Sequence, residues 1–256
     1  MTRVLTGALL AAVACYLIFW SPGWLFQFAA LAVGLICYRE YAGLVTSHSL
    51  RPPSIFGYVA GAVVILFPQY TALSFSLLAI GALALSLRLS DLREILPGTA
   101  AAFFGAIYTC LPWHFAGLLR TDSVHWLFFA LALSWSGDSV AYYVGRTFGK
   151  HRLAPVVSPK KSWEGAAGSV VGSVVFGVPY MGYFQPLAPG WKIVVIAVVA
   201  NVAGQVGDLA ESAIKRGGGI KDSGSFLPGH GGMLDRVDSS LFTLPAVYLL
   251  NKVLNS

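Results

Sequence analysis

The sequence predicts an all-α polytopic membrane protein with about nine transmembrane helices. Hydrophobic residues make up 56% of the 256 residues and charged residues 11%, whereas soluble domains average about 45–50% and about 25%. The mean hydropathy is +0.70. A soluble globule of this size would need more charge to cover its surface. The composition therefore excludes a soluble domain, a disordered chain and a nucleic-acid-binding protein that merely happens to be basic. In a membrane protein, the net charge of +6 first reflects the Lys and Arg excess of cytoplasmic loops.

Apolar runs divide the chain into nine candidate spans, judged against the ~20 residues that a helix needs to cross a core of ~30 Å. The second and third runs are short, so these two segments could instead form a re-entrant or a tilted pair of helices. Arg3 precedes the first apolar run, as a basic residue does in a signal peptide. Apolar residues continue to Trp20, however, so we expect a retained helix. The spans are residues 4–20, 24–38, 55–68, 71–87, 99–118, 124–145, 165–184, 191–210 and 237–250.

The distribution of Lys and Arg predicts the orientation. If the N-terminus is cytoplasmic, the nine spans place all but three of the 17 Lys and Arg residues on the cytoplasmic side, the exceptions being Arg120, Lys192 and Lys252. Cytoplasmic loops carry such an excess. We therefore expect an external C-terminus. The length and compactness of the chain indicate a bacterial origin, and so a multi-pass protein of the inner (cytoplasmic) membrane.

The two halves of the chain differ in chemistry. Residues 1–125 are apolar helices with short loops, and we expect them to form a scaffold with dimer and lipid contacts. Residues 126–256 are expected to form the catalytic transmembrane region. An ionisable group within a membrane span is costly to bury, so such residues are functional candidates. Asp138 and Asp208 are two of them. The acids of this half are Asp138, Glu164, Asp208, Glu211, Asp222, Asp235 and Asp238.

A first basic loop follows the sixth span and contains Ser158, Lys160 and Lys161. One interpretation is a cytoplasmic loop that touches anionic lipid headgroups. That accounts for the charge but not for the hydroxyls and glycines around the lysines. Lysines among small residues suit phosphate oxygens, because Ser and Gly permit close backbone approach. On its own this loop is a weak signal.

A second, denser segment covers residues 205–238. If residues 205–216 continue the eighth helix, i, i+3 and i+4 spacing places four polar side chains on one face: Asp208, Glu211, Ser212 and Lys215. Asp235 and Asp238 form a similar pair at the start of the ninth helix. Carboxylates beside bases and glycines are typical of a site for Mg²⁺ and a triphosphate, because Mg²⁺ takes hard oxygen ligands and shares the phosphates. No Walker A, H-E-x-x-H or G-x-S-x-G pattern is present.

The segment from Ser212 to Asp238 reads SAIKRGGGIKDSGSFLPGHGGMLDRVD. It resembles the full signature of the CDP-diacylglycerol synthases, also called phosphatidate cytidylyltransferases. Gly137-Asp138, Ser158–Lys161 and Gly207-Asp208 also look like this family, while Ser162 stands where a Thr would be expected. The resemblance covers residues 138–238; the first 125 residues resemble the family only as apolar helices.

The resemblance implies that CTP and phosphatidate react to give CDP-diacylglycerol and pyrophosphate in a membrane-embedded, Mg²⁺-dependent homodimer. It also implies a metal centre held by Asp208 and Asp235, with K⁺ as a companion ion. Asp222 and Asp238 are expected as nearby ligands or orienting groups. Lys215, Arg216, Lys221 and Arg236 are expected to hold the CTP and lipid phosphates during catalysis. The expected substrate-binding residues are Ser158, Lys160, Lys161, Ser212, His230, Gly231 and Gly232.

Two other functions fit parts of the pattern. A CTP-dependent lipid-alcohol kinase would use a similar membrane site but would transfer the γ-phosphoryl group and release CDP. The complete signature argues against it. An ion-coupled transporter would string its acids through the membrane and show symmetry between halves, whereas this sequence gathers its charge at one rim and has no repeat.

Overall fold

The computed structural model describes residues 2–87, 92–226 and 231–254. Each of the nine apolar runs corresponds to a helix, so the helical prediction is confirmed. These helices are α1 (Thr2–Phe19), α2 (Gly23–Ser47), α3 (Ser54–Leu66), α4 (Thr71–Ser86), α5 (Ile95–Asp122), α6 (Val124–Phe148), α7 (Trp163–Phe184), α8 (Gly190–Gly217) and α10 (Ser240–Val253). Short elements complete them: η1 (Pro68–Tyr70), η2 (Leu92–Glu94) and α9 (Leu234–Val237).

Several helices extend beyond the apolar runs that predicted them. The second run stops at Tyr38 because Arg39 and Glu40 follow it, yet α2 continues to Ser47 and is not short. By length and hydropathy, five segments of the described chain can cross a membrane, which agrees with a polytopic protein. They are Gly23–Ser47, Pro68–Leu85, Leu92–Asp122, Trp163–Phe184 and Gly190–Gly217. The count of nine crossings and their orientation remain predictions.

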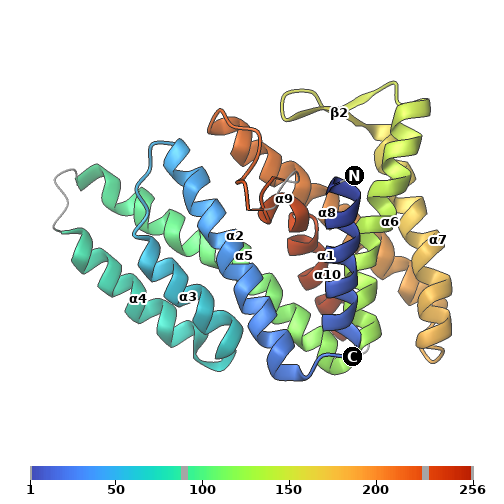
Figure 1. The fold of residues 1–256 in the computed structure, drawn as a ribbon, viewed down its shortest axis with the longest axis horizontal. Helices are drawn as coiled ribbons and strands as arrows, with labels where there is room; N and C mark the ends of the chain where they lie inside the picture. The colour runs from blue at the N-terminus through green and yellow to red at the C-terminus, as the bar shows by residue number, and fades with distance from the viewer. Residues whose placement is uncertain (1, 88–91, 227–230, 255–256) are drawn as a thin grey trace. The chain divides into compact units, whose positions relative to one another are not determined.

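The fold class is all-α as predicted, with one short β-hairpin among the described residues. Between α6 and α7 the chain forms β1 (Arg152–Ala154) and β2 (Ser158–Ser162), which pair antiparallel with Arg152 opposite Ser162 and Ala154 opposite Ser158. Pro155 and Pro159 disfavour a helix here, because proline lacks the N–H that a helix interior requires. In Figure 1 the hairpin extends from one end of the α6–α7 pair.

The described chain forms two compact units. The first comprises residues 1–117 and 214–236, and the second comprises residues 118–213 and 237–256. In the first, α2 packs on α3 and α3 on α4 (Figure 1), around a core that includes the fully buried Tyr38, Ala60 and Cys110. The signature residues 214–236 thus group with the N-terminal helices. The assignment of residues 1–125 as scaffold and 126–256 as catalytic region concerns function and remains a prediction.

The second unit is built on the close packing of α6 against α7. A Cβ atom added to Gly168 would lie 2.9 Å from the Val144 side chain, and one added to Gly172 would lie 2.5 Å from that of Val140. Two glycines four residues apart let helix backbones approach closely in membranes. This packing sets the separation of the two helices that the hairpin connects.

Candidate functional site

The second unit contains a cavity of about 580 Å³ between α6, the hairpin, α7 and α8. Its basic lining residues come from α6 and from both strands, and two acids face the same space. Small residues of α6 and α7 leave room beside them. The charged lining residues are Asp138, Arg146, Arg152, Lys160, Lys161 and Asp208. Such a mixture of cations, carboxylates and small residues is suited to a polyphosphate.

Lys161 and Asp208 form the central contact of this cavity. Lys161 Nζ lies 2.5 Å from Asp208 Oδ2, and both side chains are between a quarter and a third exposed. Ser212, one turn further along α8, donates a hydrogen bond to Asp208 Oδ1 at 3.4 Å. The structure therefore places the first basic loop beside the acid of α8, across 47 residues of sequence.

Hydrogen bonds to the start of α7 hold the hairpin that carries these lysines. Glu164 accepts hydrogen bonds from the backbone N–H groups of Lys150 at 3.2 Å and His151 at 3.3 Å, and its Oε1 lies 2.6 Å from His151 Nδ1. Ser162 caps α7 by accepting from the Gly165 N–H at 3.1 Å, as serine typically does at a helix N-terminus. Lys160 is exposed at the cavity; Ser158 belongs to the strand pairing and is half-buried.

Asp235 is the centre of a separate network in the first unit. Its Oδ1 accepts from Lys215 Nζ at 2.6 Å, and its Oδ2 accepts from the Gly232 N–H at 2.9 Å. The Ser223 N–H lies 3.2 Å from Oδ1 and 3.0 Å from Oδ2. Both oxygens therefore accept two contacts, which matches the roughly four acceptor positions of a carboxylate.

This environment keeps Asp235 ionised. Burial alone raises the pKa of Asp235, but the hydrogen bonds from Lys215, Gly232 and Ser223, together with the Lys215 charge, outweigh it and hold the pKa below its ordinary value. The side chains of Lys215 and Asp235 are only 11% and 7% exposed. A buried carboxylate thus serves as a charged anchor for the surrounding backbone.

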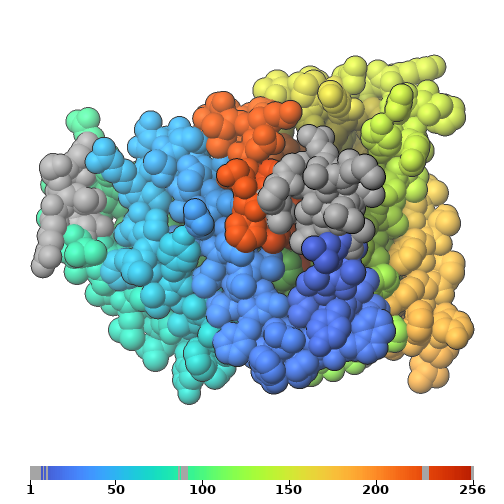
Figure 2. All heavy atoms as spheres, viewed as in Figure 1, coloured from blue at the N-terminus to red at the C-terminus, as the bar shows by residue number. Residues whose placement is uncertain are grey.

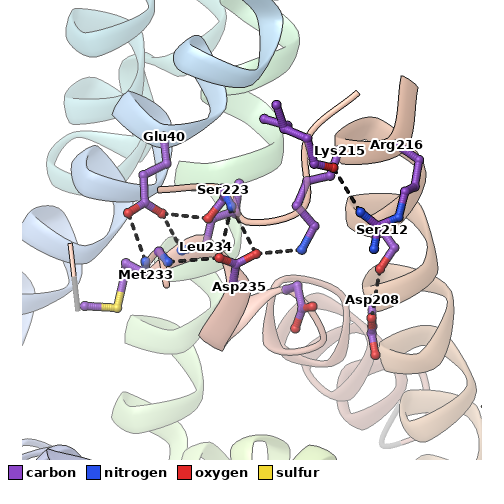
Figure 3. A network of polar contacts seen from close by, with 12 residues as sticks. Glu40, Asp208, Ser212, Lys215, Arg216, Ser223, Met233, Leu234 and Asp235 are labelled. Carbon is purple, nitrogen blue, oxygen red and sulfur yellow. Dashed lines mark hydrogen bonds and ion pairs between the residues drawn. The ribbon is translucent and has the colours of Figure 1, made fainter. Parts of the chain in front are cut away.

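Glu40 of α2 joins this network, and the sequence did not single it out. Its Oε1 accepts from the Met233 N–H at 3.0 Å, and its Oε2 accepts from the Leu234 N–H at 2.7 Å and from Ser223 Oγ at 3.1 Å (Figure 3). Glu40 is the one acid among the first 90 residues and follows an apolar run. The one feature of the sequence that could have indicated Glu40 is its isolation as an acid directly after an apolar run.

The other signature residues differ in exposure. Arg216, Lys221, Asp222 and Arg236 are exposed, and Arg216 donates to the Ile220 carbonyl at 3.0 Å. Gly231 has a φ of +80°, a conformation that favours glycine. Asp238, in the second unit, accepts from the Ser239 N–H at 2.6 Å. His230 lies outside the described residues. In Figure 2 the orange part of the first unit, which belongs to the signature segment, lies at the surface beside blue N-terminal residues.

The carboxylates of the cavity suit Mg²⁺ bound together with a ligand. Among the described residues, no three His, Cys, Asp or Glu side chains gather closely enough to form a metal cage. Mg²⁺ is usually held by one or two carboxylates together with substrate phosphates and water. Asp138 and Asp208, which line the same cavity, supply that number of carboxylates. The cavity therefore fits a metal that arrives with a phosphate-bearing ligand.

Comparison with known proteins places the chain among its relatives. Residues 1–254 match the cytidylyltransferase family. A phosphatidate cytidylyltransferase of Staphylococcus haemolyticus (strain JCSC1435) is 32% identical over 86% of this chain and 87% of its own length. One of Brucella abortus biovar 1 (strain 9-941) is 32% identical over 98% and 93%, and one of Staphylococcus aureus (strain COL) is 31% identical over 97% of each. The chain, from its first apolar helix to its last, belongs to the cytidylyltransferase family.

Proposed function

We propose that this chain is a phosphatidate cytidylyltransferase, which converts CTP and phosphatidate into CDP-diacylglycerol and pyrophosphate. The observation that carries the proposal is the similarity to relatives of that name along nearly the whole chain. The resemblance of residues 212–238 to the family signature supports the same reaction, which belongs to phospholipid biosynthesis.

The reaction requires little acid–base chemistry from the protein. A phosphate oxygen of phosphatidate attacks the α-phosphorus of CTP; a new P–O bond forms as the bond from the α-phosphorus to the pyrophosphate oxygen breaks. The second pKa of a phosphomonoester is about 6, so the attacking group is already ionised near neutral pH. The protein must align the two phosphates and neutralise the charge that develops on pyrophosphate.

The cavity of the second unit is proposed to receive the triphosphate. Lys160, Lys161, Arg146 and Arg152 provide four cations around it, and charge-assisted hydrogen bonds from such groups are the strong contacts to phosphate. A volume of about 580 Å³ lies within the range of about 300–1,000 Å³ for small-molecule sites. Ser158 and Ser212 would position the lysines and Asp208 rather than contact the nucleotide directly.

Asp208 is the proposed ligand of Mg²⁺, with Asp138 as the second carboxylate of the cavity. When bound, the ion would neutralise charge on the triphosphate. Asp235 is a different case, because Lys215 and two backbone amides occupy its oxygens. It can ligate a metal only by exchanging one of these donors, so its primary proposed role is to order the loop between α8 and α9. The K⁺ implied by the resemblance has no proposed ligands.

The exposed signature side chains are proposed to meet the lipid phosphate and the leaving pyrophosphate. Arg216, Lys221 and Arg236 are the cations available for this on the described surface of the signature segment, and Lys215 is committed to Asp235. Gly231 and Gly232 would allow close approach of a phosphate to the backbone. Asp222 and Asp238 are proposed to orient these cations.

The setting of the reaction is also a proposal. The apolar helices and the bacterial relatives support a multi-pass protein of the bacterial inner membrane, where phosphatidate enters from the bilayer. A homodimer is proposed from the family resemblance alone. A sedimentation measurement in detergent, with the detergent mass subtracted, would distinguish one chain from two.

The test of the function uses purified protein in detergent with phosphatidate, CTP, Mg²⁺ and K⁺. We expect equal amounts of pyrophosphate and of a lipid that carries CMP. Release of CDP with phosphorylation of an added lipid alcohol would reject this reaction and indicate a CTP-dependent lipid-alcohol kinase instead. Folded protein that yields neither product would reject both. A mock preparation from cells that do not express this chain, purified in the same way, is the control for contaminating activity.

A further inference from the structure

We propose that Glu40 is a positioning residue for the signature loop, defined here as residues 218–233 between α8 and α9. Glu40 lies on α2, in the half of the chain that the sequence assigned to scaffold. The inference rests on the proposed function, because the loop that Glu40 holds leads directly into Asp235. It adds a functional residue that lies on α2, far before the signature in sequence.

The first support is the pattern of hydrogen bonds. Three consecutive amides, those of Gly232, Met233 and Leu234, all donate to carboxylates: the first to Asp235, the other two to Glu40. Ser223 connects the same two acids from the other end of the loop, since its hydroxyl donates to Glu40 and its N–H donates to Asp235 (Figure 3). Two carboxylates therefore hold the described part of the loop at Ser223 and at residues 232–234.

The second support is burial. Glu40 is only 7% exposed and Ser223 only 8%. A buried carboxylate is very costly unless hydrogen bonds satisfy it, and a buried amide is also costly without an acceptor. Glu40 and its donors therefore depend on each other, so that α2 fixes the positions of Ser223, Met233 and Leu234.

The third support is the space around the carboxylate. A Cβ atom added to Gly224 would lie 2.8 Å from Glu40 Oε1, and one added to Gly232 would lie 2.5 Å from Oε2. Real Cβ atoms essentially never approach another atom more closely than 3.0 Å. Glycine at these two signature positions leaves room for Glu40, and this accounts for part of the glycine content of the loop.

The consequence concerns Asp235. Glu40 holds Leu234 and Met233, the two residues immediately before Asp235, while Asp235 binds the next amide back. A shift of the loop away from Glu40 would move the start of α9 and with it the ion pair between Asp235 and Lys215. Glu40 thus acts on the proposed reaction through Asp235 and is not itself expected to touch a substrate.

Glu40→Gln is the decisive variant, because it keeps the shape of the side chain but replaces one acceptor oxygen by a donor. Whichever way the amide turns, at least one of the loop donors loses its acceptor. Backbone hydrogen exchange, followed by mass spectrometry on overlapping peptides of residues 218–236 without substrates, is the first measurement. We expect the amides of Met233 and Leu234 to exchange at least tenfold faster, and those of Ser223 and Gly232, which bind Asp235, to accelerate as well.

Activity is the second measurement. We expect kcat of Glu40→Gln to fall at least tenfold, with the KM for CTP within threefold and the thermal midpoint within a few degrees of the wild type. Ser223→Ala removes one of the three contacts from the loop side and should give an intermediate effect, even if Glu40→Gln does not fold. Glu94→Gln, an acid of the same unit outside the network, is the control and should change neither exchange nor kcat by more than twofold.

Two results would overturn the proposal. One is faster exchange at Met233 and Leu234 alone, with the Ser223 and Gly232 amides and kcat unchanged, because Asp235 would then be positioned independently. The other is faster exchange throughout α2, α3 and α4 with a large fall in the thermal midpoint, which would make Glu40 a general stabiliser. An inactive wild type would reject the proposed reaction but not the coupling, which the exchange pattern decides.

Discussion

At the scale of the residue, Asp208 connects the cavity to the proposed chemistry. Its contact with Lys161 at 2.5 Å neutralises part of its charge, and arrival of a phosphate would offer Lys161 a second anionic partner. Asp208→Asn should lower kcat at least 100-fold, because the amide is a poor Mg²⁺ ligand and releases Lys161. The measurement is pyrophosphate release at saturating CTP, with the thermal midpoint recorded in parallel.

Asp122→Asn is the matched control for that variant. Asp122 also pairs with a lysine, Lys252, at 2.9 Å, but it does not line the cavity. Its kcat should stay within twofold of the wild type. An Asp208→Asn enzyme that retained more than a third of wild-type activity would remove Asp208 from the metal site, whatever its stability.

The buried pair of Lys215 and Asp235 makes a prediction about stability. Removing one partner of a buried ion pair leaves an unpaired charge and typically costs about 3–5 kcal/mol. Lys215→Met should therefore lower the free energy of unfolding by about that amount in a denaturant titration of the detergent-solubilised protein. Lys221→Met, at an exposed position of the same segment, should change it by no more than about 0.5 kcal/mol. Equal losses in the two variants would mean that Lys215 is not paired as described.

Sequence reasoning at this scale reached the residues inside motifs but not the long-range partners. Asp208, Lys161 and Asp235 could be named because acids and bases among glycines suggest phosphate chemistry. Glu40 could not, because its contacts span 183 to 194 residues of sequence and no local pattern encodes such a pairing. Likewise, no local pattern predicts that the Asp235 oxygens accept hydrogen bonds from backbone amides.

At the scale of the element, the α6–α7 pair depends on small residues. A Cβ atom at Gly168 would contact both methyl groups of Val144 at 2.9 and 3.1 Å, and valine has little rotamer freedom to yield. Gly168→Ala should therefore destabilise the protein by about 1–3 kcal/mol. Val144→Ala in the same chain should restore only part of the loss, because alanine keeps the Cβ atom of residue 144, which would also lie 2.9 Å from the added Cβ atom. Thermal unfolding of the purified variants measures both.

Gly182 offers the control on the same helix. A Cβ atom there meets nothing within 4 Å, so Gly182→Ala should be neutral or slightly stabilising through helix propensity. A Gly182→Ala variant as unstable as Gly168→Ala would show that α7 tolerates alanine poorly for reasons unrelated to Val144.

Helices and hairpin differ in how far the sequence could predict them. Apolar runs identified every long helix, since a run of that length has few other structures in a membrane. The ends were less accurate because polar residues continue a helix beyond its apolar run, as Arg39 and Glu40 do in α2. The hairpin was missed because strands of three and five residues are too short to show alternation.

At the scale of the whole molecule, the motifs that resemble the family cover a shorter part of the chain than the family match does. The resemblance covered residues 138–238, while the family match covers residues 1–254. The grouping of residues 214–236 with the N-terminal helices gives a physical reason for the larger extent. The signature loop needs α2 for its structure, so those helices serve as more than a membrane anchor.

The last prediction concerns the orientation of the molecule. Val156 at the hairpin and Leu187 beyond α7 are 89% and 97% exposed, and α7, a candidate span, lies between them. The basic residues around the hairpin predict a cytoplasmic position for Val156 and therefore an external one for Leu187. Single cysteines at the two positions, in a Cys15→Ser background that leaves only the buried Cys37 and Cys110, allow a direct comparison.

In intact cells whose inner membrane is accessible, a membrane-impermeant maleimide should label Leu187→Cys and leave Val156→Cys unlabelled; after the membrane is opened, both should react. Labelling of Val156→Cys alone would invert the topology and place the proposed triphosphate cavity on the external side, where CTP is not supplied. Labelling of both in intact cells would mean that α7 does not cross. Because the two positions are almost equally exposed, a difference in labelling reports the membrane barrier rather than local reactivity, and it decides which side of the membrane must provide the nucleotide.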